Sequence, residues 1–194
     1  MTFFGELEFA GFLFGLIGVW LTIKKNTWCF PAGIVNVIIT AIIVFDKKLF
    51  ADTVQQLVYF ILLIAGWILW LTKRREQTEV IIEKTQIKEY AILVPVFIAG
   101  SWLMGWLLEN YSAASLPYAD SFATVLCFIA QWMIAKRKIE NWLLWMVANP
   151  AYILIYLIKD LPLYAVLSGV YWLMSFMGYH EWNKKLSQQN AAIS

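Results

Sequence analysis

Charged residues are scarce in this chain. Of its 194 residues only 14% are Asp, Glu, Lys or Arg, whereas 61% are hydrophobic and 17% are aromatic. A soluble domain covers its core with a charged and polar surface, and this composition would leave large apolar patches in contact with water. The sequence therefore excludes an ordinary soluble domain and predicts an integral membrane protein.

Histidine and cysteine are nearly absent, which removes most metal and nucleophile chemistry. The one histidine, His180, precedes Glu181 as in a zinc-protease signature, but Lys184 stands where the second histidine is required. No Gly-x-Ser-x-Gly segment is present for a serine hydrolase. Cys29 and Cys127 are isolated in apolar segments, which favours small buried hydrophobic side chains over ligands or a disulfide. An intramembrane enzyme is the weaker alternative, and no cofactor or metal is expected.

The sequence also contains no recognisable site for energy coupling. A nucleotide-driven pump needs a glycine-rich phosphate loop ending in Gly-Lys-Ser or Gly-Lys-Thr, and the chain has none. Proton coupling usually requires carboxylates or histidines in the middle of the membrane, whereas the acids here fall near the ends of apolar segments. These absences favour a passive carrier over a pump.

Long apolar segments, in contrast, are abundant. A helix that rises 1.5 Å per residue needs about 20 residues to cross a hydrocarbon layer roughly 30 Å thick. Segments that meet or nearly meet this length lie at 7–24, 27–45, 49–71, 89–108, 119–135, 139–158 and 161–182. We therefore predict an all-α membrane protein with seven transmembrane helices.

Basic residues are distributed unevenly over the connections between these segments. If the amino end lies outside, twelve of the 15 Lys and Arg residues fall on the inner side, and only Lys47, Lys48 and Lys159 remain outside. Because Lys and Arg are retained on the cytoplasmic side, we predict an external amino end and a cytoplasmic carboxyl end. The outer side then carries an excess of acids, which would attract cationic solutes unless these acids are only solvated helix ends.

An internal repeat relates the two halves of the chain, although coincidence is the alternative because Trp and Gly are abundant. It predicts two three-helix bundles of the same orientation joined by a linker helix, with a binding site between them near the midplane. The predicted parts are a first bundle at 1–71, a cytoplasmic loop and linker helix at 72–118, a second bundle at 119–184 and a cytoplasmic tail at 185–194, which we expect to be frayed and solvated over residues 188–194. The recurring residues are Trp28 and Trp142 at a separation of 114, Asn36 and Asn149 at 113, Asp46 and Asp160 at 114, and Gly66-x-x-x-Trp70 and Gly178-x-x-x-Trp182 at 112.

The most informative motif is Trp142-x-x-Trp145-x-x-x-Asn149. Steps of three and seven residues bring these side chains to one face of a helix, and Tyr152 and Tyr156 extend the same face. Two indoles, an amide and two phenols suggest a surface for a planar, hydrogen-bonding molecule inside the membrane. Ordinary helix packing is an equally good interpretation of the spacing alone.

The motif and its surroundings resemble the sixth-helix signature of the PnuC vitamin transporters, W-x-x-W-x-x-x-N. The resemblance covers nearly the whole chain, although Pro150, directly after the motif Asn, departs from the family pattern. It implies the SWEET-like arrangement of two three-helix bundles in a bacterial inner membrane. Further similar stretches are Glu8-x-x-Gly11-x-x-x-Gly15, Ile34-Val35-Asn36-Val37, Ala51 with Gln56 and Gly66-Trp67-x-x-Trp70, and Asp120-Ser121.

The resemblance implies roles for individual residues. Trp145 would stack on the aromatic ring of the substrate, and Asn149 would hydrogen-bond its polar edge. A cationic ring over an indole face gains roughly 1 to 2 kcal/mol when desolvated. Helix–helix hydrogen bonding is the alternative for the remaining candidates. These are Gln56 and Asn36 as amides from the first half, Asp120 and Ser121 as contacts to a ribose or a positive charge, and Tyr152 and Tyr171.

The cargo that the resemblance implies is a B-vitamin precursor, first of all nicotinamide riboside. Thiamine and riboflavin are the alternatives within the family, and a small sugar is the alternative for this fold. Facilitated diffusion would be followed by phosphorylation in the cytoplasm, which traps the vitamin. The expected partners are this small molecule and the lipid bilayer, without nucleic acid; the resemblance makes a homotrimer plausible, for which the residues themselves give no argument.

Overall fold

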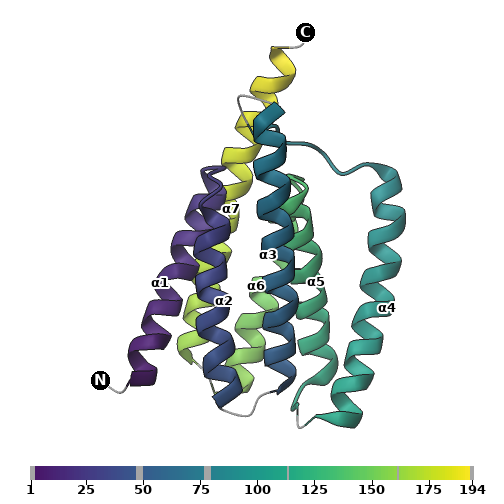
Figure 1. Cartoon of the computed structure of the whole chain (residues 1–194). Helices are drawn as coiled ribbons and strands as arrows, with labels where there is room; N and C mark the ends of the chain where they lie inside the picture. The colour runs from purple at the N-terminus through teal and green to yellow at the C-terminus, as the bar shows by residue number, and fades with distance from the viewer. Residues whose placement is uncertain (1–2, 47–49, 77–79, 113, 161, 193–194) are drawn as a thin grey trace. The chain divides into compact units, whose positions relative to one another are not determined.

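The computed structural model of the chain describes residues 3–46, 50–76, 80–112, 114–160 and 162–192 (Figure 1). Over these ranges the backbone is almost entirely helical, and one isolated parallel bridge, between Glu83 and Lys138, is the only pairing of β type. The predicted all-α fold is therefore confirmed. The helices are α1 (Phe3–Ile23), α2 (Cys29–Asp46), α3 (Phe50–Glu76), α4 (Ile87–Tyr111), α5 (Pro117–Ala135), α6 (Asn141–Ile158) and α7 (Pro162–Ala191).

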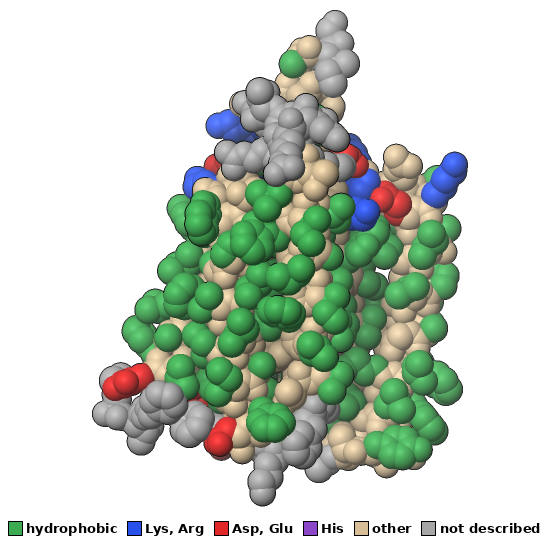
Figure 2. All heavy atoms as spheres, in the orientation of Figure 1, with side chains coloured by type: hydrophobic (Ala, Val, Ile, Leu, Met, Phe, Trp, Pro, Cys, Tyr) green, Lys and Arg blue, Asp and Glu red, His purple; other side chains and the backbone are tan. Residues whose placement is uncertain are grey.

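Six of the described helices, α1 to α6, are long and apolar enough to cross a membrane. Hydrophobic side chains cover much of the visible face along the helices, and charged side chains gather near helix ends (Figure 2). The seventh helix, α7, is not among these spans, and it carries Ser168, Tyr171, Ser175 and His180 between its apolar residues. The composition and the helices together establish a multi-pass membrane protein.

The last helix is longer than the sequence predicts. The helix that contains the predicted span 161–182 continues to Ala191, so the frayed end predicted from Gln188 onward is wrong as far as Ala191. Within this extension Leu186 is buried, with 8% of its surface exposed. Gln189 accepts a hydrogen bond from the backbone N–H of Ile82, with 3.1 Å between nitrogen and Oε1. The final turns of α7 are therefore held by contacts that hydropathy does not reveal.

Contacts divide the chain into two compact units, Met1–Ile81 and Ile82–Ser194, which we call the N-terminal unit and the C-terminal unit. In the N-terminal unit, α2 packs against both α1 and α3. In the C-terminal unit, α4 packs on α5, α5 on α6 and α6 on α7. The helix predicted as a linker, α4, thus packs within the C-terminal unit, where the rings of Phe97 and Phe122 meet edge to face at 5.3 Å.

The internal repeat has a separation of 112 residues from the end of the first repeated helix onward. Helices α2 and α6 begin at 29 and 141 and end at 46 and 158, and α3 and α7 begin at 50 and 162. The loop after the first repeated helix also recurs, since Lys25 and Arg137 both have a φ of 58°. The same separation relates two cation–π contacts, Lys24 over Trp20 at 5.1 Å and Lys136 over Trp132 at 6.0 Å from the ring centroid.

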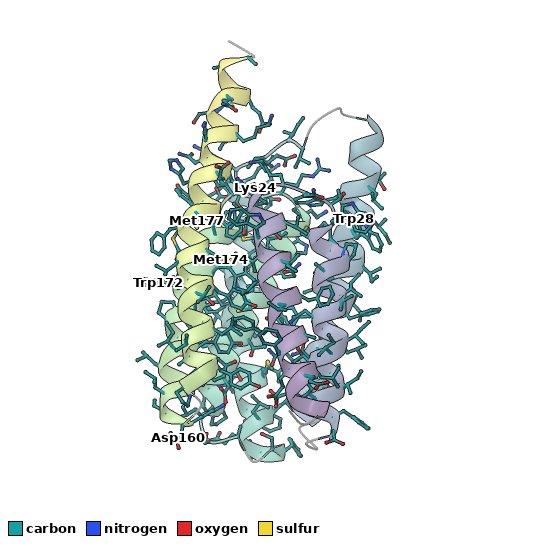
Figure 3. All side chains as sticks on the ribbon, turned by 90° about the vertical axis from the view of Figure 1, so that its left-hand side faces the viewer. Lys24, Trp28, Asp160, Trp172, Met174 and Met177 are labelled. Atoms are coloured by element: carbon teal, nitrogen blue, oxygen red, sulfur yellow. The ribbon has the colours of Figure 1, made fainter. Side chains whose placement is uncertain are left out.

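The residue pairs inferred from the sequence need correction. Trp28, predicted as the counterpart of Trp142, is 68% exposed (Figure 3), whereas Trp142 is 2% exposed. The ring of Trp142 meets Trp182 edge to face at 5.6 Å. In the N-terminal unit Phe30 takes this position and meets Trp70 at 5.2 Å. The pairs at separations of 113 and 114 therefore match residue types, whereas the bounds of α2 and α6 and the buried ring pairs repeat at 112.

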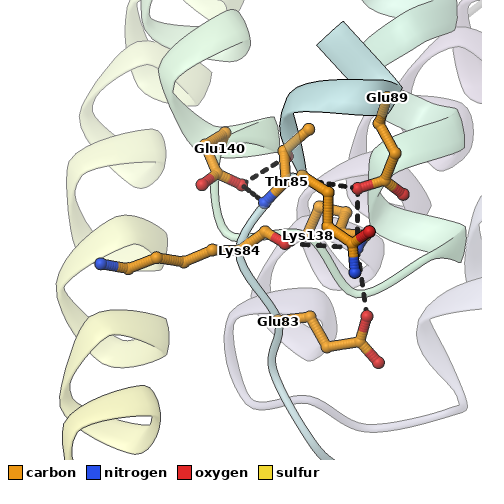
Figure 4. Close-up of polar contacts among 7 residues, drawn as sticks. Glu83, Lys84, Thr85, Glu89, Lys138 and Glu140 are labelled. Carbon is orange, nitrogen blue, oxygen red and sulfur yellow. Dashed lines mark hydrogen bonds and ion pairs between the residues drawn. The ribbon is translucent and has the colours of Figure 1, made fainter.

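Polar contacts hold the start of α4 to the α5–α6 loop (Figure 4). Thr85 donates hydrogen bonds from its backbone nitrogen and its hydroxyl to Glu140 Oε2, at 3.0 and 2.6 Å. Lys138 Nζ lies 3.1 Å from Glu83 Oε2 and 2.9 Å from Glu89 Oε2. Burial by itself lowers the pKa of Lys138, but the hydrogen bonds and charges of Glu89 and Glu83 outweigh it and raise the pKa above its usual value.

Candidate functional site

The Trp-Trp-Asn motif lies on α6 of the C-terminal unit. Trp145 and Asn149 are one turn apart, and Tyr152 and Tyr156 continue along the same face. Asn149 is 4% exposed, while the other three side chains are half-buried. An amide at this depth in an apolar helix needs hydrogen-bond partners, because an unpaired polar group in hydrocarbon costs several kcal/mol.

Asn149 finds these partners on its own helix and on α7. Its Nδ2 donates to the backbone oxygen of Trp145 at 2.9 Å and to Ser175 Oγ at 3.4 Å. Ser175 in turn donates to the backbone oxygen of Tyr171 at 2.8 Å. The structure therefore links the Asn149 amide to the backbone of Trp145 directly and to the backbone of Tyr171 through Ser175. We call Trp145, Asn149, Tyr171 and Ser175 the Asn149 group.

Ser175 is the residue of this group that the sequence analysis missed. It is 2% exposed and lies one turn after Tyr171, in a helix whose other residues at this depth are mostly apolar. The available signal was the spacing between Ser175 and the predicted site residue Tyr171. A serine on a membrane helix can donate to the carbonyl four residues earlier while its oxygen accepts from a neighbouring helix. Nothing in the sequence indicated which helix that neighbour would be.

Pro150 explains a further contact between α6 and α7. Proline has no N–H, so the carbonyl of Met146, four residues earlier, receives no backbone hydrogen bond from position 150. The indole nitrogen of Trp172, which Figure 3 labels on α7, donates to this carbonyl at 3.1 Å. The proline that departs from the family pattern thus leaves an acceptor which a tryptophan of the neighbouring helix uses.

Tyrosines continue the α6 face from the Asn149 group toward the end of α6 that is followed by Lys159. Tyr152 and Tyr156 are stacked, with ring centroids 5.5 Å apart, and Tyr164 of α7 lies 5.6 Å from Tyr156. The hydroxyl of Tyr152 is 3.2 Å from Thr124 Oγ1 on α5. The predicted site residue Tyr152 is therefore part of a polar contact between α5 and α6, and Thr124 is a second residue that the sequence did not indicate.

Asp120 and Ser121, also predicted site residues, lie in the first turns of α5. Lys159 Nζ, just beyond α6, is 2.8 Å from each carboxylate oxygen of Asp120. Ser121 is fully buried and donates to the backbone oxygen of Pro117 at 2.7 Å. The Asp120 contact joins two helix ends, and the Ser121 contact lies within the first turns of α5, so neither involves the Asn149 group. A role in substrate binding stays a prediction for both residues.

Asn36 and Gln56 belong to the N-terminal unit. Asn36 Nδ2 donates to the backbone oxygen of Gly11 at 2.7 Å, which holds α2 against α1. This approach needs a small residue, because a Cβ at Gly11 would lie 3.1 Å from the side chain of Ile39. Gln56 is half-buried on α3. The contact of Asn36 is the helix–helix hydrogen bond expected for packing, so ligand binding by these two amides also stays a prediction.

Comparisons with known proteins extend over most of the chain. A family model described as nicotinamide mononucleotide transporter matches residues 6–184. The nicotinamide riboside transporter PnuC of Escherichia coli strain K12 is 22% identical over 179 residues, covering 79% of this chain and 74% of the relative. PnuC of Neisseria mucosa is 24% identical over 172 residues, covering 81% and 64%. PnuC of Haemophilus influenzae is 26% identical over 128 residues, covering 64% and 55%.

One solved structure is similar over nearly the whole fold. The crystal structure of the vitamin B3 transporter PnuC superposes with a TM-score of 0.76 at 22% identity, covering 94% of this chain and 82% of that chain. At this identity the similarity establishes the fold, and the substrate of the relative does not transfer with it. Across the part of the chain that the structure describes, no cluster of three or more His, Cys, Asp or Glu residues is placed to hold a metal ion.

Proposed function

Because the chain belongs to the nicotinamide mononucleotide transporter family, as its motifs predict, we propose that it carries nicotinamide riboside across a membrane by facilitated diffusion. Membership makes the protein a membrane transporter rather than an intramembrane enzyme. The observation that supports this substrate is the Asn149 group, in which a buried amide lies one turn from Trp145 on α6 and bonds Ser175, one turn after Tyr171 on the packed helix α7. The names of the similar PnuC proteins point to the same riboside.

The charge of the membrane segments favours the riboside over the mononucleotide. A phosphate group entering a low-dielectric segment needs Lys, Arg or several N–H donors to compensate its charge. Lys88, in the first turn of α4, is the only Lys or Arg within the six apolar spans. The Asn149 group is neutral, which suits a cargo without phosphate and with a cationic aromatic ring.

In this proposal Trp145 stacks on the pyridinium ring and Asn149 bonds the polar substituent of that ring. Stacking together with the cation–π attraction amounts to roughly 2 kcal/mol, or about thirtyfold in affinity. The tyrosines at 152 and 171 lie on the same two helices and would border the ring. A carrier also has to release its cargo, so a few contacts of this strength are sufficient.

Transport without coupling is consistent with the placement of the carboxylates. Asp120, the acid on α5, is neutralised by Lys159, and α6 contains no acid at all. A proton-coupled carrier would need a titratable group along the pathway. We propose that phosphorylation in the cytoplasm traps the riboside. The external amino end, the bacterial inner membrane and a homotrimer stay predictions.

Ligand binding to the purified protein tests the proposal. Calorimetry with nicotinamide riboside, nicotinamide mononucleotide, thiamine, riboflavin and glucose should give the tightest binding for the riboside. Trp145→Ala and Asn149→Ala should each weaken it, the former by about thirtyfold. Tighter binding of any other compound of this panel, or unchanged affinity in both variants, would refute the proposal.

The chain contains a matched control for these variants. Asn110 on α4 donates from Nδ2 to the backbone oxygen of Trp106 at 2.8 Å, with the same four-residue spacing as Asn149 and Trp145. This second pair is exposed, with 40% of the Trp106 surface accessible. Trp106→Ala and Asn110→Ala therefore remove the same groups and the same local bond without touching the Asn149 group, and riboside affinity should stay unchanged.

A further inference from the structure

The orientation of the Asn149 amide follows from the chemistry of its partners. The backbone oxygen of Trp145, 2.9 Å away, can only accept a hydrogen bond, so the amide nitrogen and not its oxygen must face it. This reasoning matters because the two ends of an amide are assigned from their hydrogen bonds. This hydrogen bond uses one of the two N–H groups of Nδ2.

Ser175 accepts a hydrogen bond from the other N–H group. Its hydroxyl has a single hydrogen, and this hydrogen is donated to the backbone oxygen of Tyr171 at 2.8 Å. Toward Asn149 the serine oxygen is then an acceptor, at 3.4 Å from Nδ2. An amide turned by 180° would bring its oxygen against the Trp145 carbonyl, and the serine could donate to that oxygen only by giving up its bond to Tyr171, so both partners favour one orientation.

The amide oxygen is what remains for a ligand. Both hydrogen bonds that the described residues make with the Asn149 side chain use its nitrogen, and Oδ1 accepts none from them. Oδ1 is not one of the fully enclosed side-chain atoms without a partner among the described residues, so it stays accessible to a donor. An accessible carbonyl oxygen gains a hydrogen bond when a bound molecule supplies an N–H or O–H group.

Helix packing does not require this polar pair. In the N-terminal unit the positions 112 residues earlier are Val37 and Leu63, both buried and apolar. There Leu63 fills the space beside α2 and comes within 3.0 Å of the place that a Cβ on Gly33 would occupy. The same pair of helices therefore packs well with hydrocarbon alone, which indicates that Asn149 and Ser175 serve a ligand rather than the fold.

We infer that Ser175 positions the Asn149 amide with its oxygen toward the cargo, so that the site selects aromatic rings whose substituent carries an N–H donor. This deepens the proposed function and rests on it, since the donor in nicotinamide riboside is the carboxamide NH₂ group. A ring that carries a carboxylate or a ketone at the same position offers only acceptors and is discriminated against.

The test compares nicotinamide riboside with 3-acetylpyridine riboside, in which a methyl group replaces the amide nitrogen at nearly the same size. The wild-type protein should bind the carboxamide about tenfold more tightly, as expected for one lost hydrogen bond. In Ser175→Ala this ratio should fall by about threefold, because the amide loses one of the two acceptors that orient it. Ser175→Thr should restore it, since a helical threonine also bonds the carbonyl four residues earlier.

Ser101→Ala on α4 is the matched control. The hydroxyl of Ser101 is buried without a hydrogen-bond partner, so its removal should leave the ratio at the wild-type value. If Ser175→Ala does not fold, Ser175→Cys carries the test, because a thiol is a weak donor and acceptor and should lower the ratio likewise.

Equal binding of the two ribosides by the wild-type protein, or an unchanged ratio in the serine variants that fold, would overturn the inference and leave the proposed function intact. Failure of both ribosides to bind would overturn the proposed substrate, and the inference with it.

Discussion

Gly178 offers the sharpest test of the packing between α6 and α7. A Cβ built at this position would lie 2.5 Å from three atoms of the Trp142 indole ring, far inside the ordinary contact distance of 3.4 to 4 Å. The ring cannot retreat easily, because Trp142 is 2% exposed and is held edge to face by Trp182, which is fully buried. Gly178→Ala should therefore force the two helices apart or displace the indole.

The expected cost follows from these contacts. Overpacking a close-packed site costs about 1 to 3 kcal/mol, of which the better helix propensity of alanine offsets about 1 kcal/mol at most. Gly169→Ala on the same helix is the control, because nothing lies within 4 Å of its added Cβ and only the propensity gain remains. The control should be neutral or more stable by up to about 1 kcal/mol, so the two variants should differ by roughly 1 to 3 kcal/mol.

Reversible unfolding in detergent micelles, followed by tryptophan fluorescence, measures this difference. The Trp142→Phe background provides a second check, since Phe30 occupies the corresponding position of the N-terminal unit beside Trp70. In that background the smaller ring should reduce the cost of Gly178→Ala by about 1 kcal/mol. If Gly178→Ala is as stable as Gly169→Ala, the close approach of Trp142 to the α7 backbone is wrong.

Further predictions concern charges and transport. A double-mutant cycle with Asp120→Ala and Lys159→Ala should give a coupling of about 0.5 to 1 kcal/mol, as for a partly exposed pair; a coupling near zero would mean that this contact does not hold α5 to α6. The raised pKa of Lys138 means that its contribution to stability is complete below its ordinary pKa of 10.5 and declines as pH rises through the higher folded value. Unfolding at several pH values should therefore show the advantage of the wild type over Lys138→Met undiminished from neutral pH to 10.5 and declining above it, and a loss near neutral pH would contradict the ion pairs. Uptake of nicotinamide riboside into liposomes should proceed without a proton or sodium gradient, and uptake that depends on an imposed gradient would exclude facilitated diffusion.

The helices themselves were predictable because the hydrophobic length of a segment is local information. The predicted spans and the observed helices agree within a few residues at most ends, and the motif on α6 indicated the family. The repeat was also detectable, but its register was not. Identical residue types suggested Trp28 as the counterpart of Trp142, whereas the fold pairs Phe30 with it, because a buried ring can change type while the space that it fills stays the same.

The candidate site was predictable only in part. Trp145 and Asn149 were visible as one face of a single helix, since the period of the helix determines that face. Ser175 and Thr124 were not visible, because each meets its partner across an interface between helices whose relative rotation depends on packing. The ion pair of Asp120 with Lys159 was not visible for the same reason, because the two residues are 39 positions apart in the sequence and meet only when the helices pack.

The sequence by itself determined that the chain lies in a membrane, where most of its helices begin and end, and that an indole and an amide share one face of α6. These properties depend on composition and on the helical period, and neither requires knowledge of a neighbour. Only the tertiary structure decided which residues correspond between the two units, that α4 packs with the C-terminal unit, that α7 extends to Ala191 and that a serine orients the buried amide. These depend on which side chains fill the space between helices, and that is settled when distant segments pack together.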